Sequence, residues 1–351
     1  MKTRFHLWIG LLLAAVLLSA CTGNHSGGSL TTWVKATPTS SLFQSAAPTA
    51  PVTEPIAAET AIPSETEPIV QPTVEKPTPA PTLPAPSPEP PKPIRFAVIG
   101  DFGGGGSPER QVAELVDSWN PDFVITVGDN NYPNGSDETI DKNIGRFYQQ
   151  YIFPYRGEYG PGADQARFFP TLGNHDWNTN QGQPYFDYFD LPGNGRYYNF
   201  TWGPVEFFAL SSDSREPDGV SRKSIQANWL KEQLAKSQSP WKLVYFHHSP
   251  YSSGLHGPVD WMHWPFADWG ASAVLSGHDH TYERLNIDGL PYFVNGLGGG
   301  SIYDFESISE GSQFRYNDTY GAMLVTANIK QMTFDFYNWK GELIDTYQIN
   351  K

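Results

Sequence analysis

The sequence has 351 residues, enough for one or two domains, and a net charge of −14. From residue 94 onward it holds 18 Lys and Arg against 31 Asp and Glu, a net charge of −13. So acidic a surface argues against nucleic acid as a partner, and an anion-binding site would need positive charge of its own. Cys21 is the only cysteine, which excludes a zinc–cysteine site.

The amino end predicts export from the cell. Lys2 and Arg4 precede an apolar run, Leu7–Leu18, which is shorter than the about 20 residues of a membrane span. This pattern predicts a signal peptide over residues 1–20. The ending LSAC, up to Cys21, resembles the lipobox of bacterial lipoproteins. That resemblance implies cleavage before Cys21, acylation of its thiol, and an extracytoplasmic protein anchored by lipid to the membrane of the bacterial cell envelope. The alternative is an ordinary secretory signal with a chance cysteine.

Residues 21–93 read as a tether. They hold 16 of the 31 prolines, separated mainly by Thr, Ala, Ser and Glu. Such a segment cannot bury enough apolar surface to offset the entropy of ordering it. We therefore predict a disordered, extended spacer between the lipid and a catalytic domain at 94–351. A docking tract for a partner is the alternative.

Apolar strands and helices alternate in the first half of residues 94–351. Strands are predicted at 94–101, 123–129, 167–176, 241–248 and 271–280, a two-stranded hairpin at 196–213, and helices at 107–119, 137–151 and 221–237. Ser107 is the predicted N-cap of the first helix. Antiparallel strands dominate the end of the chain. The pattern predicts an α/β fold in which two sheets form a sandwich with helices outside.

Polar clusters follow five of these strands. They are GDFG (100–103), GDNNY (128–132), GNHD (173–176), VYFH (244–247) and GHDH (277–280). Ligands of open α/β sheets gather at the carboxyl ends of the strands, so we expect these clusters to meet at one rim. Their carboxylate, phenol, amide and imidazole groups suit metal ions. The donors are too many for one ion and sufficient for two that share a bridging ligand.

The five clusters, in this order, resemble the motifs of the calcineurin-like metallophosphoesterases. The tyrosine in GDNNY resembles that of the purple acid phosphatases. The resemblance implies a metallophosphoesterase sandwich with α/β/β/α layers. It also implies that a first metal is bound by Asp101, Tyr132 and His280. A second metal would be bound by Asn174, His247 and His278, and Asp129 would bridge the two.

The charge of these ligands predicts two different metals. A free phenol has a pKa near 10, so a phenolate at neutral pH needs a strong Lewis acid. Asp101, Asp129 and Tyr132 together offer three negative charges, which suits Fe³⁺. The second set offers neutral groups and the shared carboxylate, which suits a divalent ion such as Zn²⁺, Mn²⁺ or Fe²⁺.

Two such ions would clamp a phosphate and supply a metal-bound hydroxide that attacks phosphorus. The leaving alkoxide then needs a proton. His175 is the first candidate donor, and we expect Asp176 to orient it. The resemblance implies that His256 contacts the phosphate or the leaving group, although Leu255 stands where the family has a second histidine. His248 is either a further substrate contact or a packing histidine.

The expected function is an acid phosphatase that hydrolyses small phosphomonoesters. A phosphodiesterase is an alternative, because the motifs do not separate the two activities. A surface-binding lipoprotein that has lost turnover is another. The aromatic segments 184–189 and 261–269 are expected to pack in the core or at the rim, with a sugar platform as the alternative.

Overall fold

The computed structural model describes residues 92–351. The predicted signal peptide, Cys21 and nearly all of the predicted tether lie outside these residues. Within residues 92–351, no helix is both long and apolar enough to cross a membrane.

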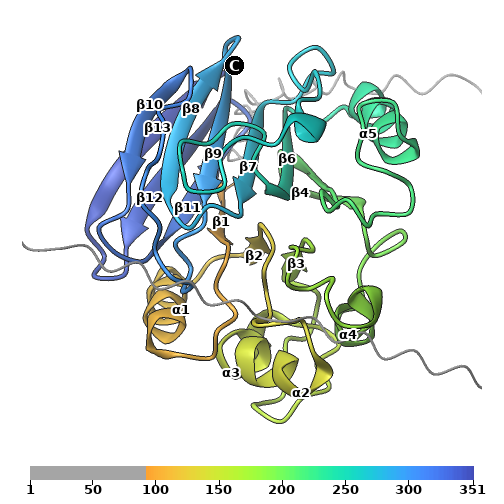
Figure 1. Cartoon of the computed structure of the whole chain (residues 1–351), viewed down its shortest axis with the longest axis vertical. Helices are drawn as coiled ribbons and strands as arrows, with labels where there is room; N and C mark the ends of the chain where they lie inside the picture. Colours follow the sequence, from red (N-terminus) through yellow and green to blue (C-terminus); the bar gives the residue numbers. More distant parts are fainter. Residues whose placement is uncertain (1–91) are drawn as a thin grey trace, which may run out of the picture. The chain divides into compact units, whose positions relative to one another are not determined.

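Two sheets form the fold (Figure 1). The first has six strands, in the order β13 (Leu343–Asn350), β12 (Gln331–Asn338), β11 (Gly321–Ala327), β1 (Ile94–Ile99), β2 (Phe123–Thr126) and β3 (Phe168–Pro170). The second has seven strands, in the order β10 (Ser312–Tyr316), β8 (Tyr282–Ile287), β9 (Leu290–Asn295), β7 (Ala273–Gly277), β6 (Trp241–His248), β5 (Val205–Ala209) and β4 (Tyr198–Trp202).

The predicted helical segments contain α1 (Ser107–Trp119), α2 (Asp137–Ile140), α3 (Arg146–Tyr148) and α5 (Ile225–Lys236). A further helix, α4 (Gln183–Tyr188), was not predicted. A π-helical turn, Asp141–Gly145, joins α2 to α3, and 3₁₀ turns span Gln149–Tyr151, Asn180–Gly182 and Asp260–Met262. The N-cap of α1 differs from the prediction: Gly106 caps the helix without a side-chain hydrogen bond, and Ser107 lies in the first turn beside Pro108.

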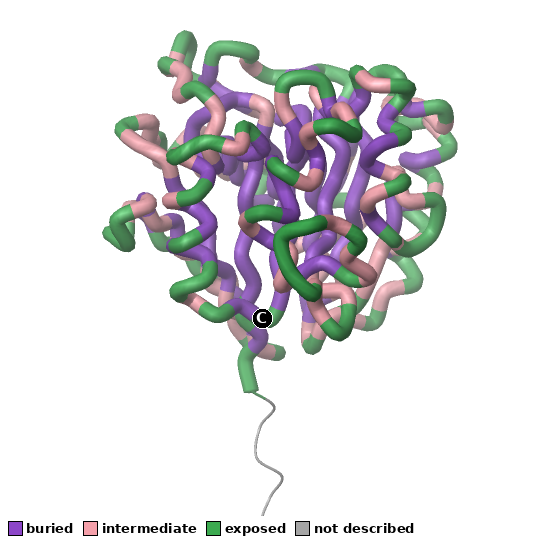
Figure 2. Tube along the Cα trace, turned by 90° about the horizontal axis from the view of Figure 1, so that it is seen from below, coloured by how far each residue is buried: buried purple, intermediate pink, exposed green. Residues whose placement is uncertain are grey.

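Side-chain alternation along the strands builds a layered core. In β1, Phe96 and Val98 join the cluster between the two sheets, whereas Ala97 and Ile99 face the cluster shared with α1. A third cluster packs α5 against the outer face of the second sheet. Figure 2 shows the buried strands running between exposed loops. This order of layers, with helices on both outer faces, agrees with the predicted sandwich.

The topology brings the polar clusters to one rim. Strands β1, β2 and β3 run parallel, and so do β5, β6 and β7 in the other sheet. Four of the polar clusters predicted from the sequence lie at the carboxyl ends of β1, β2, β3 and β7, and the fifth forms the end of β6. Hydrogen bonds between residues of the two sheets at this rim show that the sheets meet there.

Candidate metal centre

The first sheet contributes two buried carboxylates and a phenol. Asp101 is fully buried and Asp129 is 2 % exposed, at the ends of β1 and β2. The Tyr132 hydroxyl donates to Asp129 Oδ2 at 3.1 Å and lies 3.1 Å from His280 Nε2 of the second sheet. Tyr132 therefore lies between Asp129 and His280, and its phenol oxygen contacts both of them.

The second half of the centre forms around His247, at the end of β6. Its Nε2 lies 3.4 Å from Asp129 Oδ2, 3.0 Å from Asn174 Oδ1 and 3.2 Å from His278 Nδ1. The donors of the two predicted sets thus meet at Asp129. One ligand atom each from Asp101, Asp129 and His247 lies within 4.8 Å of the others, close enough to hold a metal ion.

Backbone contacts fix the histidine rings. His247 Nδ1 lies 2.9 Å from the Val127 carbonyl oxygen, and His280 Nδ1 lies 2.5 Å from that of Ser301. A carbonyl oxygen can only accept, so each Nδ1 carries a hydrogen and each Nε2 faces the interior of the centre. This outer hydrogen bond is the usual support of a metal-binding histidine.

The electrostatics of the described residues fit a cation at this position. Burial raises the pKa of the Tyr132 phenol, and the neighbouring carboxylates Asp101 and Asp129 raise it further. Burial opposes a charge on His247, but Asp129 and Asp101 outweigh it and raise the pKa of His247 to about 10. The two carboxylates thus favour a positive charge beside them, and the protonated His247 supplies it. A metal ion would meet the same demand and would favour the phenolate.

Strained backbone marks three of the predicted ligands. Asp101, Asp129 and His278 have φ values of 56°, 52° and 71°, in the left-handed region that residues with a side chain seldom adopt. Such strain concentrates at functional sites, where the surrounding structure holds it in place.

Close approach explains two glycines of the motifs. A Cβ on Gly173 would lie 2.1 Å from Asp129 Oδ1, and one on Gly128 would lie 2.6 Å from His247 Nδ1. Any side chain at either position would displace a predicted ligand.

His175 lies at the open edge of the centre. Its backbone N–H donates to Asp129 Oδ1 at 2.9 Å, and its Nε2 lies 3.9 Å from Asp129 Oδ2. The side chain is 35 % exposed, and its ring packs against Tyr132 with centroids 4.5 Å apart. The imidazole therefore borders both the donors and the solvent from which a substrate would arrive.

Asp176 does not orient His175 as expected. Its buried carboxylate accepts hydrogen bonds from the Asn130 backbone and side chain and from the Gly173 backbone. The His175 ring is held instead by the Pro133 carbonyl oxygen, 2.5 Å from Nδ1. Burial and the nearby Asp129 raise the pKa of Asp176 to about 7. Asp176 supports the turn around Asp129 and makes no hydrogen bond to the imidazole, because its carboxylate is taken up by Asn130 and Gly173.

His256 contacts the centre from the loop that follows β6. Its ring stacks on His278 with centroids 4.2 Å apart, and its backbone N–H donates to Asp279 Oδ1 at 2.7 Å. The other carboxylate oxygen of Asp279 accepts from Ser252 Oγ at 2.5 Å. Asp279, the residue between His278 and His280, thus anchors the loop that carries His256.

His248 is a buried packing residue. Its Nδ1 lies 2.9 Å from Ser212 Oγ. Its ring contacts the ring of Trp261 and the ring of His278. Burial and the charge of His247 lower the pKa of His248 to about 3, so it stays neutral. These contacts favour the packing interpretation of the two left open by the sequence.

Sequence reasoning missed Arg215. Its guanidinium forms a forked pair with Asp213, at 2.7 and 2.8 Å, and donates to the Asn174 carbonyl oxygen at 2.8 Å. It also donates to Asn178 Oδ1 at 2.9 Å, so it binds both ends of the turn that carries His175. No local motif around residue 215 signals these contacts, because they join segments about 40 residues apart.

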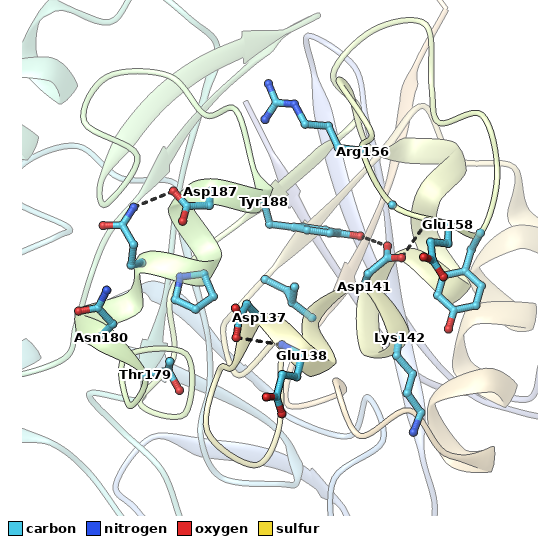
Figure 3. A pocket seen from close by; sticks show the side chains of 15 residues that line it. Asp137, Glu138, Asp141, Lys142, Arg156, Glu158, Thr179, Asn180, Asp187 and Tyr188 are labelled. Atoms are coloured by element: carbon cyan, nitrogen blue, oxygen red, sulfur yellow. Dashed lines mark hydrogen bonds between the residues drawn. The ribbon is translucent and has the colours of Figure 1, made fainter.

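A pocket of about 660 Å³ lies away from this centre, beside α2 and α4 (Figure 3). The carboxylate of Asp141 lies in its wall and accepts hydrogen bonds from Tyr155, Tyr188 and the Glu158 backbone. The residues that line it, all in the described part of the chain, include none of the seven predicted ligands. The metal chemistry therefore does not belong to this pocket.

The fold and the rim of metal-binding side chains define a metallophosphoesterase. The family described as calcineurin-like phosphoesterase matches residues 94–282, more than half of the chain, and the chain belongs to it. The predictions of a two-sheet metallophosphoesterase fold and of a phosphoesterase hydrolase are confirmed.

Its curated relatives include purple and tartrate-resistant acid phosphatases. Tartrate-resistant acid phosphatase type 5 of Homo sapiens is 26 % identical over 244 residues, which cover 58 % of this chain and 73 % of that protein. Purple acid phosphatase 7 of Arabidopsis thaliana is 24 % identical over 295 residues, which cover 74 % of this chain and 86 % of that protein. The expected likeness to purple acid phosphatases is thereby confirmed.

Two solved structures share the fold. The purple acid phosphatase PPD1 of yellow lupin aligns with a TM-score of 0.59 and 20 % identity, over 75 % of this chain. The alignment spans only 55 % of the lupin chain. GAP50, named as the anchor in the inner membrane complex of Plasmodium, aligns with a TM-score of 0.56 and 20 % identity, over 74 % of this chain and 89 % of its own.

Proposed function

We propose that this protein is an acid phosphatase that hydrolyses small phosphomonoesters at a centre of two metal ions. The convergence of Asp101, Asp129 and His247 within 4.8 Å, surrounded by the other predicted donors, carries this proposal. The named acid phosphatases among its relatives support the choice of reaction.

Seven side chains would hold the metals. Fe³⁺ would take Asp101, Tyr132 and His280, and a divalent ion, Zn²⁺, Mn²⁺ or Fe²⁺, would take Asn174, His247 and His278. Asp129 would bridge them, consistent with its contacts to both His247 and Tyr132. Such ions, when bound, offset the charge of a phosphate and make water a better nucleophile.

His175 would supply the proton for the leaving group. Its Nδ1 donates to the Pro133 carbonyl oxygen, which leaves Nε2 to face a substrate. His256, beside His278, would contact the phosphate or the leaving group from the other side of the rim.

Arg215 would position the turn that bears Asn174 and His175. Its contacts with Asn174 and Asn178 lie on either side of His175 in the sequence.

The amino end supports a location for the enzyme. Residues 1–20 would direct export, and a lipid on Cys21 would anchor the protein outside the cytoplasm, with residues 21–93 as a tether. Mass spectrometry of the mature protein tests this: an amino-terminal diacylglyceryl cysteine is expected. An unmodified Cys21, or cleavage at another residue, would contradict it.

Turnover of p-nitrophenyl phosphate against bis-p-nitrophenyl phosphate tests the reaction class. The metal-replete protein is expected to prefer the monoester at acidic pH and to lose activity after chelation. Preference for the diester would replace the proposal with a phosphodiesterase. No turnover of either ester by metal-replete protein would favour a binding protein.

A further inference from the structure

Trp261 presents a fixed, exposed aromatic surface beside the candidate metal centre. The residue is 42 % exposed. Its Nε1–H donates to the Ser212 carbonyl oxygen at 3.0 Å, and its own carbonyl oxygen accepts from Trp264 Nε1 at 2.9 Å. Both the indole and its backbone are therefore held in place, although much of the ring faces solvent.

Only one ring separates Trp261 from a predicted ligand. Its centroid lies 5.9 Å from that of His248, which lies 4.5 Å from that of His278. Ser212 binds both neighbours, since its carbonyl accepts from Trp261 and its hydroxyl contacts His248. The position of the indole is thus linked to that of His248 at the end of β6.

A second exposed apolar side chain, Leu255, precedes another histidine that contacts His278. Leu255 is 52 % exposed, and the ring of the following His256 stacks on His278. Single exposed apolar residues are common on protein surfaces. Here, however, one of them contacts His248 and the other precedes His256, two of the histidines that contact His278, and Trp261 is fixed by hydrogen bonds.

The predicted metal ligands and the exposed apolar side chains suit the two halves of a phosphate ester. The ligands can hold the phosphoryl group only through metal ions, so the group esterified to it would extend away from them, toward Trp261 and Leu255. A planar ring there would stack on the indole. The side chain of the adjacent Asp260 is 96 % exposed, and its charge disfavours an anionic leaving group.

We propose that Trp261 forms a subsite for the leaving group of aromatic phosphomonoesters whose ring carries no negative charge. This inference rests on the proposed phosphatase function and adds the class of leaving group. Trp261 is a specificity-determining residue in this account and takes no part in proton transfer or metal binding.

The first test compares two esters in each variant of the metal-replete protein. The ratio of kcat/KM for 1-naphthyl phosphate to kcat/KM for glycerol 3-phosphate cancels any general loss of activity. Trp261→Leu should lower this ratio about two- to tenfold, the usual effect of an aromatic pair. Trp261→Phe should restore most of it. Trp339→Leu, in the turn after β12, serves as the matched control and should leave the ratio unchanged.

An unchanged ratio in Trp261→Leu, or an equal fall in Trp339→Leu, would overturn the subsite. Calorimetry with non-hydrolysable ligands separates this result from failure of the proposed function. The wild-type holoenzyme should bind 1-naphthylmethylphosphonate more tightly than methylphosphonate, and Trp261→Leu should remove the difference. If wild-type protein hydrolyses neither ester, the phosphatase proposal fails, and the binding difference still decides the subsite.

Discussion

His175 allows catalysis and metal binding to be tested separately. Its imidazole borders the donors, but its Nδ1 is engaged by Pro133 and its Nε2 lies 3.9 Å from Asp129. His175→Ala should lower kcat by about 10²- to 10⁴-fold, the usual contribution of a general acid. Elemental analysis should find the wild-type metal content in the variant. Loss of metal would instead make His175 a ligand.

Arg215 tests whether a residue outside the motifs positions the centre. Hydrogen bonds from a charged donor contribute about 1.5–3 kcal/mol. Arg215→Gln removes the forked pair with Asp213 and the charge behind the Asn174 contact, so kcat/KM should fall roughly 10- to 100-fold. Arg215→Lys keeps the charge but not the fork, and should rescue little of this loss.

Measured together, kinetics and urea unfolding distinguish positioning from stability in these variants. Full recovery by Arg215→Lys would show that charge alone matters. Wild-type kcat/KM in Arg215→Gln would contradict the positioning role. The side chain of Arg215 is 40 % exposed, but that of its partner Asp213 is only 6 % exposed, so Arg215→Gln should also lower stability.

These residues show what the sequence could reveal about the site. The seven predicted ligands could be proposed because each sits in a short motif at a strand end. Arg215 could not, because its contacts with Asn174 and Asn178 depend on how distant loops meet. The role of Asp176 was misjudged for a related reason: adjacency in sequence to His175 does not fix which way a carboxylate points.

Helix α1 buries a carboxyl group whose titration affects stability. Glu109 is 1 % exposed, and only one of its carboxylate oxygens has a hydrogen-bond partner, the Gly105 backbone N–H at 2.6 Å. Burial raises the pKa of Glu109 well above its usual value, despite opposing effects of Gly105 and Arg146. The folded state therefore holds this proton more tightly than the unfolded state does.

The direction of the pH effect follows. The contribution of Glu109 to stability is complete below its unfolded pKa of about 4.5 and is lost as the pH rises through the raised folded pKa. Glu109→Gln should remove this loss, so the variant should gain stability relative to wild type between pH 5 and pH 8. Urea unfolding at both values measures the difference. A constant difference between wild type and variant would show that Glu109 keeps an ordinary pKa.

The elements themselves were largely predictable, but their partners were not. Apolar periodicity placed α1 at 107–119, and the run WKLVYFHH placed β6. The sequence could not show that β11 inserts next to β1, or that β8 and β9 extend the second sheet. The β1–β11 pairing joins strands far apart in the chain, and periodicity reports only which face of each strand is buried, not which strand lies beside it.

At the scale of the whole molecule, the described part should fold on its own. Within residues 92–351, strand β1 begins at Ile94, and three hydrophobic clusters pack the two sheets and their helices together. A fragment from Lys92 to Lys351 should therefore unfold cooperatively in urea, with the wild-type kcat/KM after metal loading. Failure of this fragment to fold, while the chain from residue 22 folds, would show that the predicted tether contributes to the domain.

The asymmetry of the two ligand sets explains how an acidic protein could hold a phosphate. Buried carboxylates at Asp101 and Asp129 would concentrate positive charge at one point while the surface stays negative. In the proposed centre, the phenol of Tyr132 would favour iron(III) at one of the two positions. The proposed chemistry requires these unlike cations to lie side by side.

Elemental analysis of the purified, metal-replete protein, joined to its visible spectrum, tests that claim most directly. We expect two metal ions per chain, one of them iron, and an absorption band from phenolate-to-iron charge transfer that Tyr132→Phe abolishes. A colourless protein with fewer than two ions, or a band that survives Tyr132→Phe, would contradict it.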